Sequence, residues 1–163
     1  MTEPEARQDV LVIKHYGPSD VPTIFPLVKE ELERAINISG GRYSIPQTLH
    51  ELLIGKLTLW VVWDDEDPIA AWVLRIIDYP GRRTMYGDLL GGNRMAEWAG
   101  MMDAVVIDWA QKFKCTHIEI GGRDGWIRYA KPFGYEKAYW VIEKEVPAKE
   151  GETFEDTASV TVE

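Results

Sequence analysis

The sequence RTMYGDLLGGNRMAEWAGMMDAVVIDWAQKFKCTHIEI spans residues 83–120, and its apolar pattern changes period twice. Residues 83–90 are rich in side chains that favour strands, and residues 117–120 alternate between polar and apolar side chains. A strand, a helix and a returning strand predict a parallel pair of strands, with the helix packed on the sheet. The helical stripe between them follows the Gly91-Gly92-Asn93 turn and consists of Trp98, Met102, Val105, Trp109 and Phe113.

Upstream of this unit, the sequence predicts one strand and two helices. The strand is a short apolar run at residues 10–13. Apolar residues then recur at helical spacing over residues 24–36, and Gly40-Gly41 ends this first helix. Ser44 and Gln47 stand three residues apart, which is the spacing of a capping box, and they predict the start of a second helix.

Three further strands are expected at residues 57–63, 69–77 and 83–90. An acidic turn at residues 64–67 joins the first two, and a turn at residues 78–81 joins the second pair. Because short connections favour antiparallel neighbours, this part of the sheet is predicted to be antiparallel.

After residue 120, the sequence predicts a short helix at residues 124–131 and a last strand at residues 138–146. The complete order is β-α-α-β-β-β-α-β-α-β. This order predicts an α/β fold with a mixed sheet and helices on both of its faces. One domain is expected over residues 9–146, between a polar tail at residues 1–8 and an acidic tail at residues 147–163.

Composition excludes several classes of function. A formal net charge of -9 argues against a general binder of nucleic acid or of anionic membranes, because phosphate contacts need clustered Lys and Arg. Cys115 is the only cysteine, and His15, His50 and His117 show no metal-ligand spacing, so no metal site is predicted. No secretory signal or membrane span is seen in the sequence, and the expected location is the cytoplasm.

The order of elements and the C-terminal sequence resemble the GNAT (general N-acetyltransferase) superfamily. The resemblance covers roughly residues 10–146 and is strongest from Asp88 onward. The sequence RDGWIRYAKPFGYE at residues 123–136 is similar to the family's C-terminal motif, in which a helix ends in Gly followed by an aromatic residue and often Glu. The Gly-Arg-x-Gly-Trp sequence at residues 122–126 also resembles GNAT-like proteins of tailed bacteriophages and prophages.

The resemblance implies a site for acetyl-CoA after the strand that ends near Leu90. In the family, this strand pairs with the pantetheine amides, and the pyrophosphate binds amides at the N-terminus of the next helix. By position, Leu89 and Leu90 would face pantetheine, and the phosphate loop would be Gly91, Gly92, Asn93, Arg94 and Met95. The loop departs from the family's pattern of small residues. Gly91-Gly92 is therefore either a phosphate loop or only a tight strand-to-helix turn.

Three residues are candidates for the chemistry of acyl transfer, which needs a base for the amine and an acid for the leaving thiolate. Asp88, just before the expected pantetheine site, is the first candidate base, and Glu119 is the second. The alternative for each is a carboxylate at a sheet edge or one paired with an Arg. The family's usual acid is a Tyr, but its position holds Ala130, so the neighbouring Tyr129 is either a re-registered acid or a packed aromatic residue.

The sequence leaves three functions open. The first is transfer of an acetyl group from acetyl-CoA to a small amine or a protein amino group. The second is a catalytically degenerate GNAT-fold protein of a bacteriophage virion, found in the host cytoplasm or the virion, with other virion or assembly proteins as partners. The third is a regulatory domain that binds CoA without turnover. Trp126 and Trp140 either belong to the core or line a substrate or partner surface.

Overall fold

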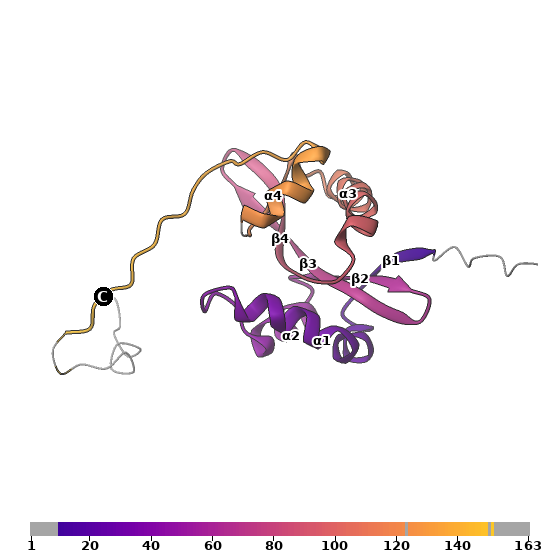
Figure 1. Ribbon diagram of the computed structural model, residues 1–163, viewed down its shortest axis with the longest axis horizontal. Helices are drawn as coiled ribbons and strands as arrows, with labels where there is room; N and C mark the ends of the chain where they lie inside the picture. The colour runs from indigo at the N-terminus through magenta and orange to yellow at the C-terminus, as the bar shows by residue number, and fades with distance from the viewer. Residues whose placement is uncertain (1–9, 123, 150, 152–163) are drawn as a thin grey trace, which may run out of the picture.

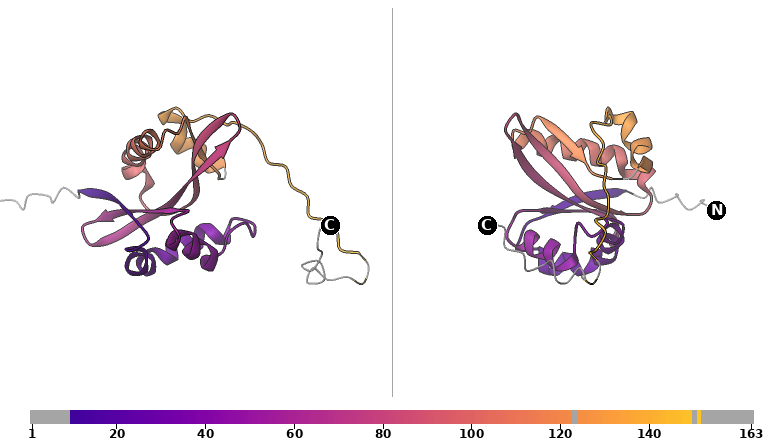
Figure 2. Two further views of the ribbon diagram at one scale, coloured as in Figure 1. Left: turned by 180° about the vertical axis from the view of Figure 1, so that it is seen from behind. Right: turned by 90° about the vertical axis from the view of Figure 1, so that its left-hand side faces the viewer.

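The computed structural model describes residues 10–122, 124–149 and 151, and it places one five-stranded sheet between two helical layers (Figure 1). Helices α1 (Val21–Asn37) and α2 (Ile45–Leu53) cover one face of the sheet. Helices α3 (Met95–Lys112) and α4 (Asp124–Ala130) cover the other face, and the second view in Figure 2 shows the same layers edge on. The strands are β1 (Leu11–Tyr16), β2 (Thr58–Asp64), β3 (Asp67–Tyr79), β4 (Arg82–Gly92) and β5 (His117–Ile120).

The sheet has the strand order β1-β2-β3-β4-β5, so each strand lies beside its neighbour in the chain. The first three pairs are antiparallel, and β4 pairs with β5 in parallel through the crossover helix α3. The predicted mixed sheet, its antiparallel part and its parallel pair are confirmed.

Two apolar cores hold the layers together, one on each face of the sheet. The core under α1 and α2 includes Val28, Leu32 and Val73. The core under α3 includes Trp60, Trp72 and Trp98, and the rings of Trp60 and Trp98 each stack on the ring of Trp72. Alternation along the strands sends successive side chains to opposite cores, which fixes the register of the sheet.

A β-bulge on β4 sets the geometry of the site. Gly87 pairs with Leu74 and Leu89 pairs with Val73, so Asp88 is an extra residue with no partner on β3. A bulge bends its strand and increases the local twist. The parallel pairing with β5 ends at the Gly87–Ile120 pair, and over Leu89–Gly92 the strand β4 is paired on its β3 side alone among the described residues. The two strands therefore separate at the bulge.

The predicted last strand at residues 138–146 is wrong. After the 3-10 turn η1 (Lys131–Phe133), Gly134 has a φ of 90°, and the chain continues without strand pairing. Figures 1 and 2 show this segment leaving the body of the molecule. A run of β-favouring residues forms a strand only when a neighbouring edge accepts it, and the turn at Gly134 carries the chain away from β5.

Residues 137–149 are called the C-terminal arm below. The expected tail at residues 1–8 lies outside the described residues, as do residues 150 and 152–163 of the expected acidic tail. None of the helices in the described part of the chain is long and apolar enough to cross a membrane. The same described residues contain no group of three or more His, Cys, Asp or Glu side chains that could hold a metal ion.

Candidate functional site between β4 and β5

A cavity of about 370 Å³ opens where β4 and β5 separate. Both helical layers contribute to it, because the gap between the strands connects the two faces of the sheet. Its walls include Leu89 and Leu90 of β4, the Gly121-Gly122 segment after β5, and Trp126 of α4. Ligand sites in proteins are concave and mostly apolar, with a few polar groups, and commonly have volumes of about 300–1,000 Å³. This cavity fits that description.

Asp88 is the carboxylate in the described wall of the cavity, and its side chain is only 2% exposed. It accepts a hydrogen bond of 2.5 Å from Arg75 Nε and a longer one of 3.3 Å from the Tyr43 hydroxyl. A second nitrogen of Arg75 donates to Glu51 at 3.2 Å. Burial raises the pKa of Asp88 above its usual range, although the bonds from Arg75 and Tyr43 act in the opposite direction.

Two tyrosines that the sequence did not single out lie beside Asp88. Tyr43 and Tyr86 both line the cavity, and burial followed by the charge of Asp88 raises the pKa of each hydroxyl. The Tyr86 hydroxyl lies so close to Gly121 that a Cβ at this position would overlap it. Tyr86 could have been found from the sequence, because it precedes Asp88 by two residues in a predicted strand. Nothing in the local sequence marked Tyr43 or Arg75.

Glu119 and Tyr129, the other two candidate catalytic residues, do not line this cavity. The Glu119 carboxylate forms an ion pair with Arg82. The Arg128 guanidinium lies 5.2 Å from the centre of the Tyr129 ring, and both residues belong to α4. Of the three predicted catalytic residues, the structure brings only Asp88 into the cavity.

Gly91 and Gly92, predicted as the start of a phosphate loop, are the last two residues of β4. A Cβ on Gly91 would overlap the carbonyl oxygen of Glu31 in α1 and would lie 2.8 Å from its carbonyl carbon. Gly92 has a φ of 144°, and a Cβ there would overlap Ala70 of β3. Both glycines are therefore required by the packing of β4 against α1 and β3.

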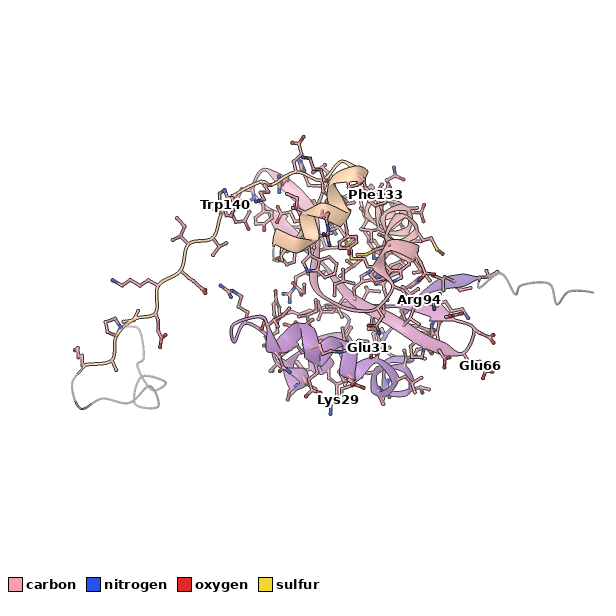
Figure 3. The ribbon with its side chains drawn as sticks, viewed as in Figure 1. Lys29, Glu31, Glu66, Arg94, Phe133 and Trp140 are labelled. Atoms are coloured by element: carbon pink, nitrogen blue, oxygen red, sulfur yellow. The ribbon has the colours of Figure 1, made fainter. Side chains whose placement is uncertain are left out.

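Asn93, Arg94 and Met95 complete the predicted loop, and the Asn93 N–H and the Arg94 guanidinium have partners inside the protein. The Asn93 N–H donates to the Ile69 carbonyl at 2.8 Å. Arg94, with a φ of 60°, donates to the Asp64 carboxylate at 2.5 Å and to both oxygens of Glu97 at 2.5 and 3.0 Å. Figure 3 shows Arg94 near the sheet, with Glu31 on the helical layer beneath it.

No protein-family model and no curated protein sequence matches the chain. Among solved structures, a predicted acetyltransferase with acetyl-CoA from Clostridium acetobutylicum is 16% identical, has a TM-score of 0.60, and is matched over 83% of this chain and 96% of its own. A GCN5-related N-acetyltransferase from Ralstonia eutropha is 12% identical, has a TM-score of 0.60, and is matched over 83% and 99%.

A third solved structure is the aminoglycoside N-acetyltransferase AAC(6')-Iy in complex with a bisubstrate analogue of CoA and acetylneamine. It is 14% identical, with a TM-score of 0.66, and is matched over 85% of this chain and 99% of its own. The fold is that of the GNAT acetyltransferases. At these identities the likeness establishes the fold alone, and none of these three structures bears on the resemblance to bacteriophage proteins.

The two halves of the donor site expected in a GNAT fold differ in how well this chain fits acetyl-CoA. The open edge of β4 over Asp88–Leu90 and the cavity beside it fit an amide-bearing chain such as pantetheine. The N-terminus of α3 does not fit a diphosphate, because Arg94 is held by two carboxylates and Glu97 stands in the first turn. The residues predicted to bind cofactor thus lie close together, but of these only Leu89 and Leu90 line the cavity.

Proposed function

We propose that this chain is an N-acyltransferase that moves an acyl group from a thioester donor, of which acetyl-CoA is the one to test, to an amine bound beside Asp88. The observation that carries the proposal is the nearly buried Asp88 carboxylate in the wall of the cavity between β4 and β5. Burying a carboxylate is costly, and perturbed carboxylates in cavities are concentrated at functional sites. The GNAT fold of the chain agrees with this proposal.

The charges around the cavity favour a cationic acceptor. Asp88 and Arg42 stand in the cavity wall, where Arg75 bridges Asp88 to Glu51 and Arg42 is paired with Glu143. These three carboxylates and two guanidinium groups together are net negative, so an ammonium group is attracted to them. Small amines and protein amino groups are the acceptors that this charge supports. In keeping with this, AAC(6')-Iy and related solved structures are aminoglycoside acetyltransferases.

In the proposed reaction Asp88 removes the proton that the amine must lose before it attacks. The amine nitrogen then bonds to the acyl carbon, the carbon–sulfur bond of the thioester breaks, and the thiolate takes up a proton from Tyr86 or from water. The raised pKa of Asp88, caused first by burial, strengthens it as a base. Arg75 orients the carboxylate through its short hydrogen bond and does not itself take part in the proton transfer.

The test is thiol release from acetyl-CoA with a panel of polyamines, aminoglycosides and lysine peptides. Asp88→Asn is expected to lower kcat by about 10²-fold or more, because general base catalysis contributes about 10²–10⁴-fold. Glu119→Gln is the matched control, since this carboxylate lies outside the cavity, and it should leave kcat within about twofold. Absence of turnover with every amine, or an unchanged kcat in Asp88→Asn, would refute the proposal.

A second candidate function is a catalytically degenerate GNAT-fold protein that assembles into a bacteriophage virion. The observation that favours it is the C-terminal arm, where Trp140 is 68% exposed and Ile142 is 94% exposed (Figure 3 labels Trp140). Contiguous exposed apolar residues mark surfaces that bind partners. A thermal melt with millimolar acetyl-CoA separates the two candidates, because binding at 100 times Kd adds about 2.7 kcal/mol of stability. No shift and no turnover would support the assembly protein, whereas a shift without turnover would support a regulatory CoA-binding domain.

A further inference from the structure

The N-terminus of α3 is the usual place for an anion in this kind of strand-to-helix connection, yet here the cation of the loop, Arg94, is already bound by two carboxylates. We infer that the chain recognises its acyl donor through the acyl-pantetheine portion alone, and that the nucleotide diphosphate of CoA adds no binding energy. The inference rests on the proposed acyl transfer, and it specifies the chemical class of the donor.

Backbone amides are the first reason. An anion site at a helix N-terminus needs free N–H groups that point toward the ligand. The Asn93 N–H donates to Ile69, and the Glu97 N–H donates to the Arg94 carbonyl at 3.0 Å. The Asn93 carbonyl also accepts a bond of 2.7 Å from the Trp98 indole N–H, which fixes the loop from the inside. These two amides are therefore not available to a phosphate, which would have to bind the N–H groups of Arg94, Met95 and Ala96.

Charge is the second reason. Arg94 is the one cation of the predicted loop, and three of its hydrogen bonds go to Glu97 and Asp64. Bonds to these two carboxylates raise the pKa of Arg94, and the bond from Arg94 lowers the pKa of Glu97. A diphosphate would have to break these bonds and would then face two uncompensated carboxylates. Together the three side chains carry one positive and two negative charges, so they repel an anion.

Packing is the third reason, because the loop cannot shift toward a ligand. Gly91 lies directly against the backbone of α1 at Glu31, and Gly92 lies against Ala70 of β3. A strand end enclosed between a helix and a neighbouring strand is fixed on both sides. In this chain the two glycines allow close packing of the protein on itself, and so they are not available for close approach to a phosphate.

Only a few residues away, the same strand is open. From Asp88 to Leu90, β4 has no partner on its β5 side among the described residues, and these three residues line the cavity of about 370 Å³. An unpaired strand edge offers alternating N–H and C=O groups, which match the two amides of pantetheine. The open edge of β4 thus fits the acyl-pantetheine portion of the donor, whereas the N-terminus of α3 does not fit the nucleotide diphosphate.

The experiment compares two donors by titration calorimetry with the full chain. Acetyl-CoA and S-acetylpantetheine, which has no phosphate, are expected to bind with Kd values within about threefold of each other. A Kd for acetyl-CoA that is tenfold or more lower than that of S-acetylpantetheine would overturn the inference and leave the proposed acyl transfer standing. If neither thioester binds, the inference and the proposed acyl transfer both fail.

A pair of double variants tests the electrostatic reason directly. Asp64→Asn with Glu97→Gln frees Arg94, so acetyl-CoA is expected to bind tenfold or more tightly while S-acetylpantetheine binds as before. Asp65→Asn with Glu66→Gln is the matched control, because it removes the same charge from exposed positions of the nearby β2–β3 turn (Figure 3 labels Glu66). Equal gains in both double variants would show a general charge effect and would overturn the specific role of Arg94.

Discussion

The two ends of a five-residue segment of β4 behave differently, although the sequence predicts functional residues at both. At Asp88 a bulge leaves a carboxylate nearly buried in the wall of a cavity, where its burial is costly and is not explained by apolar packing. At Gly91-Gly92 the same strand is enclosed by α1 and β3, and the following Arg94 is held by two carboxylates. A glycine pair and an arginine before a helix can be explained entirely by packing and ion pairs within the protein. A buried carboxylate beside a cavity indicates a ligand-binding or catalytic site.

The largest expected effect comes from filling the enclosed end of β4. Gly91→Ala should destabilise the protein by about 3 kcal/mol, because its Cβ would overlap the backbone of Glu31, which has no flexible side chain to move aside. Gly87→Ala on the same strand is the control, since the nearest atom to its Cβ would be 3.7 Å away, and it should change stability by less than about 1 kcal/mol. Urea unfolding measures both. Equal stabilities would mean that β4 and α1 can separate at Gly91.

The fold was predictable because its signals are local and agree with one another. The change of period over residues 83–120 predicted the parallel pair, and the predicted Ser44 cap accepts a hydrogen bond of 3.2 Å from the Gln47 N–H. The bulge at Asp88 and the contact of Gly91 with Glu31 depend on how distant segments meet, so no local pattern contained them. Residues 138–146 have the composition of a strand, but strand formation also requires pairing with β5. That pairing depends on the path of the chain after Gly134, which no local pattern contains.

The next largest effect concerns the open end of β4 and the partner of Asp88. Arg75→Met should destabilise the protein by about 2 kcal/mol at pH 7, because it leaves the Asp88 carboxylate buried without its cation. The Arg75 side chain is 30% exposed, so the loss is smaller than for a fully buried pair. The double variant Arg75→Met with Asp88→Asn should recover most of this stability. A double variant as unstable as Arg75→Met would show that the lost packing of Arg75, and not the unpaired charge, is responsible.

The pH dependence of this variant has a definite sign. Arg75 opposes the rise in the pKa of Asp88 that burial causes, so Arg75→Met should raise this pKa further. A carboxylate whose folded pKa lies above its unfolded value stabilises the fold at low pH, and this contribution is lost as the pH rises through the folded pKa. The difference in stability between Arg75→Met and the parent should therefore shrink as the pH falls toward the ordinary Asp value of 3.8. Thermal melts between pH 3 and pH 7 measure it.

The smallest effect is expected at the closed end, where Glu97→Gln removes one of the two carboxylates that hold Arg94. The Arg94 hydrogen bond lowers the pKa of Glu97, so its contribution to stability is present above the ordinary Glu value of 4.5 and is lost as the pH falls through the folded value. The variant should melt less than about 4 °C below the parent at pH 7, and the difference should shrink as the pH falls below 4.5. A difference that stays the same down to pH 3 would point to altered packing of the first turn of α3. Glu97→Gln also removes a negative charge from the N-terminus of α3, so it should lower stability while it raises the affinity for anions. Arg75→Met, beside Asp88 at the open end of the β4 segment, should instead lower both stability and activity.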